Sequence, residues 1–225
     1  MSSYGLAIHT SSSDLGLALS NFAGEGRSQH WDLGRSLSSH LHQYLIDFMQ
    51  PQTWADLQYI AVAKGPGGFT GTRIGVVAAR TLAQQLNLPL FGISSLAAVA
   101  WHGRSQTIGL NPASVEASST ALIDQASRTD VAVQMRAQRG ELFVAIYGIS
   151  DAGLVELLPD TVMAEEKWQQ MLPTWTRPCR LIQAEGGLGM TATSLLELAH
   201  LGWQQELRPD WSTVLPFYGQ HPVSA

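Results

Sequence analysis

The chain has 225 residues, of which 45% are hydrophobic and 14% charged, and 18 acidic against 13 basic residues give a formal net charge of −5. This length is enough for one or two compact lobes with a hydrophobic core, and the low charged fraction indicates surface buried by a partner. No apolar stretch approaches the ~20 residues that span a bilayer, and the lone Cys179 excludes an internal disulfide, so we expect a cytoplasmic protein. The acidic balance argues against tight RNA binding by the chain alone, because the nearest approach to a basic cluster is Arg136 with Arg139.

Strand patterns open the chain and a helical pattern follows them. Apolar runs at residues 6–10 and 15–19 predict two strands joined by a Ser-rich turn, and a Gly-Glu-Gly turn leads into a third strand over about residues 27–33. A helix is predicted over about residues 36–49, because apolar side chains recur there on one face. These side chains are Leu37, Leu41, Tyr44, Leu45 and Phe48.

A strand at residues 59–63 breaks into a glycine-rich loop, Lys64-Gly-Pro-Gly-Gly-Phe-Thr-Gly-Thr-Arg-Ile-Gly75, which leads into a helical pattern over residues 71–86. Such a helix start presents free backbone N–H groups, which suit a phosphate, a carboxylate or the close approach of another backbone. The loop does not match the P-loop, because Lys64 precedes its glycines. It does not match the dinucleotide fingerprint either, because Thr70 stands where the third glycine belongs.

A structural turn is the alternative interpretation of this loop. Thr70 would cap the first helical turn, and Phe69 would pack on Ile74. Asn87, followed by Leu88 and Pro89, predicts the end of the helix.

The helix after the loop has two apolar faces. One stripe predicts packing on the lobe's own sheet; it consists of Ile74, Val77, Ala78, Leu82 and Leu86. The neighbouring face carries small residues every four positions and allows another helix to approach closely; it consists of Gly75, Ala79 and Ala83, flanked by Val76. Two interpretations of this small face stay open, namely packing on the helix at residues 36–49 and contact with a second chain.

The order of elements predicts a duplicated α/β fold. Three strands followed by helix, strand, helix and a short strand at residues 90–93 form the half-unit of the ribonuclease-H-like fold. Strand patterns at residues 131–135 and 142–146, joined by a turn at residues 138–140, echo this order. We therefore expect two lobes, residues 1–105 and 106–225, with mixed five-stranded sheets flanked by helices. Residues 103–130 would link the lobes, and the C-terminal segment would pack back on the first lobe.

Four segments of the chain resemble the bacterial TsaB/YeaZ family. They are Ile8-His-Thr-Ser-Ser12, the glycine loop with its helix, Ala137-Gln-Arg-Gly-Glu-Leu-Phe143 and Pro216-Phe-Tyr218. This family belongs to the actin/Hsp70/sugar-kinase superfamily. It serves in the synthesis of N6-threonylcarbamoyladenosine (t6A), the modified base beside the anticodon of tRNAs that read ANN codons.

The resemblance implies a non-catalytic partner subunit that binds and supports a catalytic TsaD-like subunit. It also implies a homodimer when the chain is alone, a TsaE-like ATPase in the assembly, and only indirect contact with tRNA. No cofactor is required, although ATP or ADP at the partner interface would contact Gly65, Gly67, Gly68, Thr70 and Gly71. The implied partner interface consists of Leu37, Leu41, Leu45, Thr72, Gly75, Val76, Ala79 and Ala83.

Two positions depart from the ATP-using members of the superfamily. Those proteins end the first strand in an aspartate that helps to hold the nucleotide's metal ion, whereas this chain has His9, a poor ligand for Mg²⁺. Arg136 likewise replaces the aspartate of the second-lobe motif. Both changes argue against an autonomous kinase or ATPase, and we expect no catalytic residues. A small-molecule phosphotransferase or nucleotide hydrolase that uses the interlobe cleft stays as the alternative.

A metallopeptidase is a further enzyme class to consider. His40 and His42 are two residues apart on a predicted helix and diverge by about 200° around its axis, so they cannot share one metal ion. The sequence contains no His-Glu-x-x-His motif and no nucleophile elbow. We therefore expect no metal site.

Overall fold

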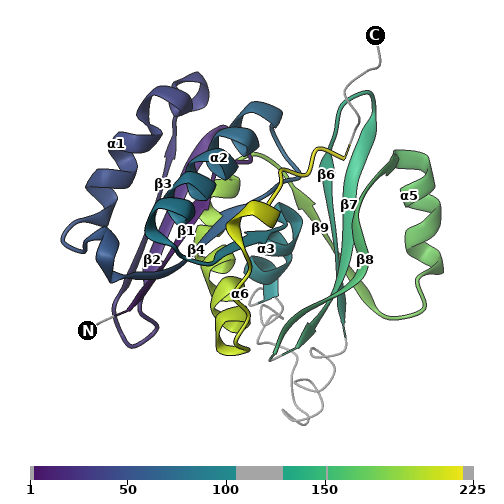
Figure 1. Ribbon diagram of the computed structural model, residues 1–225. Helices are drawn as coiled ribbons and strands as arrows, with labels where there is room; N and C mark the ends of the chain where they lie inside the picture. The colour runs from purple at the N-terminus through teal and green to yellow at the C-terminus, as the bar shows by residue number, and fades with distance from the viewer. Residues whose placement is uncertain (1–2, 105–128, 151, 220–225) are drawn as a thin grey trace, which may run out of the picture.

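The computed structural model describes residues 3–104, 129–150 and 152–219. In these ranges the chain forms two mixed β-sheets flanked by helices (Figure 1). The first sheet has five strands in the order β3-β2-β1-β4-β5, and β1 pairs antiparallel with β2 and parallel with β4. Its strands are β1 (Tyr4–His9), β2 (Asp14–Ser20), β3 (Gly26–Asp32), β4 (Leu57–Ala63) and β5 (Leu90–Ile93).

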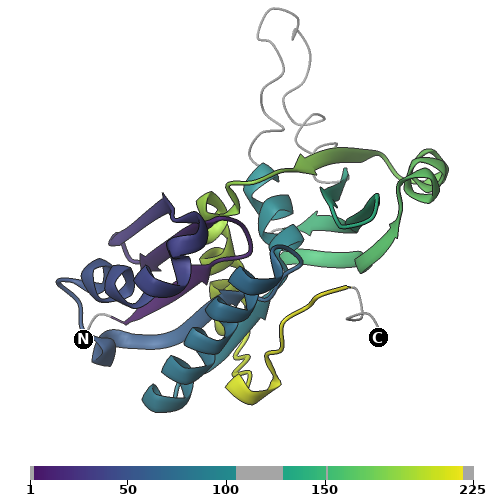
Figure 2. The ribbon, with the colours of Figure 1, turned by 90° about the horizontal axis from the view of Figure 1, so that it is seen from above.

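Helices cover both faces of the first sheet. Leu6 and Ile8 of β1 pack with α1 and α2 on one face, whereas Ala7 packs with α6 on the other, because side chains alternate along a strand. α1 and α2 lie side by side on their face (Figures 1 and 2). The helices are α1 (Leu37–Met49), α2 (Phe69–Leu86), α3 (Ser95–His102), α5 (Glu165–Met171) and α6 (Ala192–Gln204).

The second sheet repeats the pairing pattern of the first. Its order is β8-β7-β6-β9, and β6 pairs antiparallel with β7 and parallel with β9, as β1 does with β2 and β4. α3 packs on one face of this sheet, between the sheet and α6 (Figure 2), and Trp168 of α5 packs on the other face. The strands are β6 (Asp130–Arg136), β7 (Glu141–Ser150), β8 (Gly153–Ala164) and β9 (Cys179–Ala184).

The predicted duplicated α/β fold is confirmed, with one correction to its second half. The first sheet has the expected five strands, but the second has four among the described residues. The physical reason is where the chain goes after β9. It enters the 3₁₀ helix η6 (Leu188–Thr191) and α6, which packs on the first sheet instead of leading to a fifth strand.

The segment after α6 lies beside the first sheet. The Leu90 N–H donates to the Pro209 carbonyl oxygen at 3.1 Å, and the Phe217 N–H donates to the Lys64 carbonyl oxygen at 2.6 Å. The predicted lobe boundary after residue 105 and most of the predicted linker, 103–130, lie outside the described residues, so this division of the chain stays a prediction. Within the described ranges no helix is both long and apolar enough for a membrane span.

Candidate functional site

The glycine loop closes tightly on the end of β1. The Gly68 N–H donates to the Ser11 carbonyl oxygen at 2.8 Å, and a Cβ added to Gly67 would overlap the same carbonyl group. A Cβ on Gly71 would overlap the Thr10 carbonyl oxygen. The sequence allowed these glycines to contact a phosphate, a carboxylate or another backbone. The structure shows that another backbone, that of Thr10 and Ser11, approaches them closely.

The start of α2 is fixed by β1 and not by a side-chain cap of its own. The helix begins at Phe69 with Gly68 as its N-cap, so the predicted cap at Thr70 is wrong. The Thr10 hydroxyl donates to the Gly71 carbonyl oxygen at 2.8 Å and holds the first turn instead. Phe69 lies with its ring centroid 4.5 Å from that of Tyr218, in the C-terminal segment.

The end of α2 follows the prediction. Asn87 adopts the left-handed conformation with φ of 53°, and its N–H donates to the last carbonyl groups of the helix. This residue type tolerates that conformation well, and the chain then leaves through Pro89.

His9 is fully buried where β1 ends. Burial lowers the pKa of its imidazole to about 4, against a smaller opposite effect of the Asp14 charge, so the ring is neutral near pH 7. The Ser11 N–H lies 3.4 Å from Nδ1 of His9, and Nε2 has no partner. The end of β1 therefore carries neither a carboxylate nor a positive charge.

Asp14 is the carboxylate nearest in sequence to His9, and it is occupied by a structural role. Its Oδ2 accepts the Gly189 N–H at 2.6 Å, and the Ser12 hydroxyl donates to its Oδ1. The same hydroxyl accepts the Leu188 N–H at 3.0 Å. These bonds attach the turn between β1 and β2 to η6, so Asp14 joins the first sheet to the segment that follows β9.

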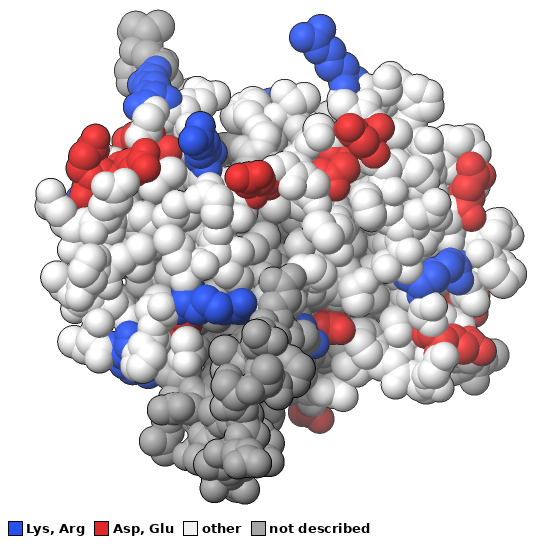
Figure 3. Space-filling view, turned by 180° about the vertical axis from the view of Figure 1, so that it is seen from behind, with Lys and Arg blue, Asp and Glu red and all other residues white. Residues whose placement is uncertain are grey.

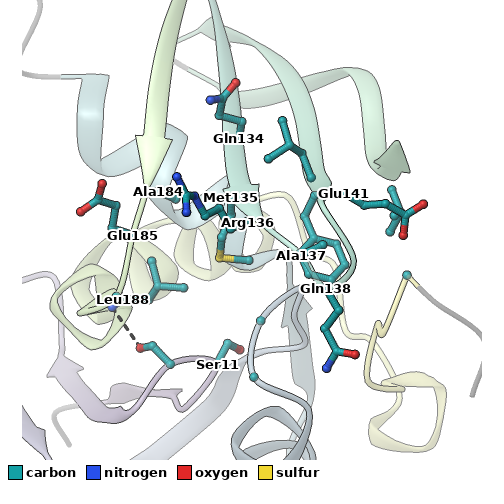
Figure 4. A pocket seen from close by; sticks show the side chains of 18 of the residues that line it. Ser11, Gln134, Met135, Arg136, Ala137, Gln138, Glu141, Ala184, Glu185 and Leu188 are labelled. Carbon is teal, nitrogen blue, oxygen red and sulfur yellow. Dashed lines mark hydrogen bonds between the residues drawn. The ribbon is translucent and has the colours of Figure 1, made fainter. Parts of the chain in front are cut away.

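A cleft of about 1420 Å³ lies beside this turn (Figure 4). Ser11, Gly68 and Phe69 line it on the side of the first sheet, and the end of β6 with its turn lines it on the side of the second sheet. Arg136 and Arg139 belong to that second wall, and both are exposed. Neither guanidinium makes a hydrogen bond or an ion pair with any described residue. Three carboxylates also line the cleft, those of Glu141, Glu165 and Glu185.

Histidines and carboxylates do not gather into a metal site in the part of the chain that the structure describes: no group of three or more such side chains, cysteines included, is placed to hold an ion. His40 and His42 are both exposed on α1. Lys and Arg side chains are scattered singly over the face shown in Figure 3, with Asp and Glu among them.

The predicted partner-interface residues are the largest correction. All eight are buried in the folded chain, on the inner sides of α1 and α2: Leu37, Leu41, Leu45, Thr72, Gly75, Val76, Ala79 and Ala83. A Cβ on Gly75 would overlap the Thr10 hydroxyl, and Ala79 and Ala83 join the core cluster under α1 and α2. The small residues do mark a close approach, but the approaching element is the lobe's own sheet.

The stripe that was expected to face the sheet lies farther out. Ile74, Ala78 and Leu82 are half-buried, and Val77 is 53% exposed. On α1, Ile46 is 51% exposed and lies just off the buried side of the helix. Sequence reasoning missed Ile46, although its position outside the predicted apolar face could have marked it.

The repeated strand order and the cleft between the halves define a duplicated ribonuclease-H-like protein. Two solved structures from Pseudomonas aeruginosa share this fold. YeaZ matches with a TM-score of 0.72 and 20% identity over 96% of this chain and 99% of that chain. A protein described as uncharacterized with similarity to peptidase YeaZ matches with a TM-score of 0.73 and 21% identity over 97% of this chain and 100% of that chain.

Sequence comparisons are more specific than the fold. Residues 43–138 match the family model described as TsaD, tRNA N6-adenosine threonylcarbamoyltransferase. The chain is 34% identical to the tRNA threonylcarbamoyladenosine biosynthesis protein TsaB of Bacillus subtilis over 139 residues, which are 61% of this chain and 50% of that protein. The match thus spans half the length of that relative. These findings confirm the resemblance to the TsaB/YeaZ family that the four sequence segments indicated.

Proposed function

We propose that this protein is a partner subunit of the t6A synthesis machinery. It binds a TsaD-like subunit through the outer face of α1 and α2 and has no catalytic activity of its own. The name of the Bacillus subtilis relative, a tRNA threonylcarbamoyladenosine biosynthesis protein, supports a role in t6A synthesis. The observation that supports this docking surface is the exposure of two apolar side chains, Ile46 on α1 and Val77 on α2.

The chemistry of this outer face suits a moderate protein interface. Polar residues surround the apolar side chains, including Gln43 and Asp47, which are linked by a hydrogen bond of 2.9 Å, and the exposed Arg73. An apolar centre within a polar rim is typical of specific interfaces. Completing the burial of a half-exposed Val or Ile contributes about 1 kcal/mol each. When no TsaD-like protein is present, we propose that the same face joins two copies of the chain.

The absence of autonomous catalysis is supported by the state of the cleft. A phosphotransferase would need carboxylates to hold a nucleotide-bound metal ion. Here His9 is buried and neutral, Asp14 is bonded to the Gly189 N–H, and Arg136 takes the place of the second carboxylate. We expect purified protein with Mg-ATP to release phosphate only at background rate. Turnover of ~1 s⁻¹ or faster would instead favour the phosphotransferase or hydrolase alternative.

The docking proposal is tested by co-purification with the cognate TsaD-like protein. Val77→Arg and Ile46→Arg each place a charge in the proposed contact and should abolish co-elution, while thermal melting of the chain alone stays nearly unchanged. Val155→Arg is a matched control, because Val155 is a similarly exposed valine, at 54%, on β8 of the second sheet. Co-elution of both α1–α2 variants at wild-type level would place the interface elsewhere.

The remaining partners are proposals of the same kind. We propose that tRNA contacts the assembly mainly through the TsaD-like subunit, as the net charge of −5 supports. Sub-micromolar binding of tRNA by the lone chain at physiological salt would contradict this. Binding of a TsaE-like ATPase, and of ATP or ADP at the partner interface, should require the TsaD-like subunit and should be lost with Val77→Arg.

A further inference from the structure

A second cavity, of about 520 Å³, lies at the edge of the first sheet that β5 forms. β5 lines it on one side, and the segment that follows α6, drawn in yellow in Figures 1 and 2, lines it on the other. It shares no lining residue with the cleft described above. The segment is bonded to the sheet at both ends of β5, where the Leu90 N–H donates to Pro209 and the Phe217 N–H donates to Lys64. These bonds leave no path for an extended peptide along the edge, so the cavity suits a small molecule.

The backbone of β5 presents unpaired polar groups to this cavity. The Leu90 N–H points away from β4, since it donates to the Pro209 carbonyl oxygen. Gly92 lies two residues further along the strand and therefore points the same way. Its N–H has no hydrogen-bond partner among the described residues, and neither have the carbonyl oxygens of Leu90 and Gly92. The cavity thus offers one backbone donor and two backbone acceptors, groups that are normally paired in folded proteins.

Lys64 is the one charged residue among those that line the cavity. It is half-buried, and its ammonium group makes no hydrogen bond or ion pair with a described residue. Asp160 lies near enough for an electrostatic interaction with Lys64, but its Oδ1 accepts from the Ser94 hydroxyl at 2.8 Å and from the Tyr147 hydroxyl at 3.0 Å. A partly buried ammonium group without a hydrogen-bonded partner is unfavourable, so Lys64 would stabilise an anion in the cavity.

The remaining walls of the cavity are mostly apolar. Val214, Leu215, Pro216 and Phe217 line it from the C-terminal segment. Val214 is buried against Gly92, whereas Leu215 is 62% exposed, so a ligand beside it would cover apolar surface. Apolar walls with a few convergent polar groups are typical of small-molecule sites, and the volume falls in their usual range.

We propose that this cavity binds a free α-amino acid with an apolar side chain. Its carboxylate would accept from the Lys64 ammonium group and the Gly92 N–H, its ammonium group would donate to the carbonyl oxygen of Leu90 or Gly92, and its side chain would pack beside Leu215. One cation and one N–H match a single carboxylate, and the two carbonyl oxygens require a donor on the same ligand. No residue of α1 or α2 lines the cavity, so this site does not depend on the proposed partner.

The test uses NMR spectroscopy of the full chain with L-leucine as the probe. The chain has two lysines, Lys64 and Lys167, so selectively lysine-labelled protein gives two side-chain signals. L-leucine should shift the side-chain signal of Lys64 and the amide signal of Gly92 with one shared dissociation constant, of about 1 mM or below. Lys167 is exposed on α5, away from the cavity, and its signal should stay in place as the internal control.

Two analogues of leucine test the two charged groups of the ligand separately. Leucinamide lacks the carboxylate that Lys64 would bind, and 4-methylpentanoate lacks the ammonium group that the carbonyl oxygens of β5 would bind. Each should bind at least about tenfold more weakly than L-leucine, because each loses a hydrogen bond that involves a charged group. Equal affinity of 4-methylpentanoate and L-leucine would overturn the assignment of the ligand as an amino acid.

Variants of the lining residues test the location of the site. Lys64→Met removes the charge and keeps most of the length of the side chain, so it should weaken leucine binding about tenfold without lowering the melting temperature. Leu215→Glu places a negative charge beside the bound carboxylate and should also weaken binding. Leu207→Glu is its matched control, because Leu207 is a similarly exposed leucine, at 53%, of the same segment but outside the cavity.

Three further results would overturn the proposal. They are unchanged Lys64 and Gly92 signals at about 20 mM L-leucine, wild-type affinity of Lys64→Met, and a loss of affinity in Leu207→Glu as large as that in Leu215→Glu. None of these results bears on co-elution with a TsaD-like protein, so failure here and failure of the proposed function are distinguishable.

Discussion

The inner and outer sides of α2 differ in how closely they are packed. On the inner side, a Cβ added to Gly71 or Gly75 would overlap Thr10 just after β1, and Ala79 is fully buried. The outer side, with Arg73 and Val77, is exposed. The same helix therefore has one side that determines whether the lobe folds and one side that is free to bind a partner. Small residues mark the first side, and exposed apolar residues mark the second.

The strongest test of this difference is Ala79→Arg against Val77→Arg. Ala79 is fully buried in the core, so an arginine there brings an unpaired charge and excess volume, which should cost about 4 kcal/mol or more and unfold much of the protein. Val77→Arg should change the free energy of unfolding by less than about 1 kcal/mol. Urea unfolding followed by circular dichroism measures both. Ala79→Arg with wild-type stability would show that the two sides have been assigned the wrong way round.

A smaller substitution tests the packing of the inner side of α2 against the residues at the end of β1. Gly71→Ala adds one methyl group against the Thr10 carbonyl oxygen, and we expect a loss of about 2–3 kcal/mol in the free energy of unfolding, because the backbone must move. Gly186→Ala is the matched control, since a Cβ there meets no atom within 4 Å. Equal stability of the two variants would mean that the glycine loop is not closely packed.

His9, the last residue of β1, makes the stability of the protein depend on pH. Its pKa is about 4 in the folded state against an ordinary value of 6.5, so the unfolded state binds the extra proton between these values. Stability from this group is complete above pH 6.5 and is lost as the pH falls toward 4; from pH 7 to pH 5 the loss is about 2 kcal/mol. Urea unfolding of wild type and His9→Gln at both pH values isolates this contribution. A wild-type loss no larger than that of His9→Gln would contradict the burial of a neutral imidazole.

The smallest effect is expected at Asn87, the C-cap of α2, because its contribution is local and does not involve the inner or the outer side of the helix. Asn87→Ala should lower the free energy of unfolding by about 1 kcal/mol, because alanine tolerates the left-handed conformation less well than asparagine. Asn87→Gly should be neutral or slightly stabilising, and thermal melting can compare the two. If both variants lose the same stability, side-chain contacts of Asn87 matter and the local explanation fails.

Local signals were sufficient for most elements. The short strand Leu90–Ile93 was predicted to the residue, and the end of α2 at Asn87 and the turn at residues 138–140 follow from residue types that favour those conformations. The order of these elements was enough to predict a duplicated fold. Arg136 and Arg139 were recognised as a pair from sequence, but their position opposite Ser11 was not, because the two walls of the cleft are over a hundred residues apart.

The tertiary structure decided the orientation of α2 and the cap at its start. Ile74, Ala78 and Leu82 lie one residue before Gly75, Ala79 and Ala83, so the two faces differ by only about 100° around the helix axis, and both are apolar. Periodicity cannot choose between them; the choice is made by Thr10, just after β1, whose hydroxyl lies too close to Gly75 for a larger side chain, and by the core that buries Ala79. For the same reason Thr10, and not Thr70, holds the first turn. The sequence thus predicted the strands of the first sheet, α1, α2, β6 and β7 in their order, but not α3, β8, α5, β9 or α6. Contacts between distant segments determined which surface of each element is buried.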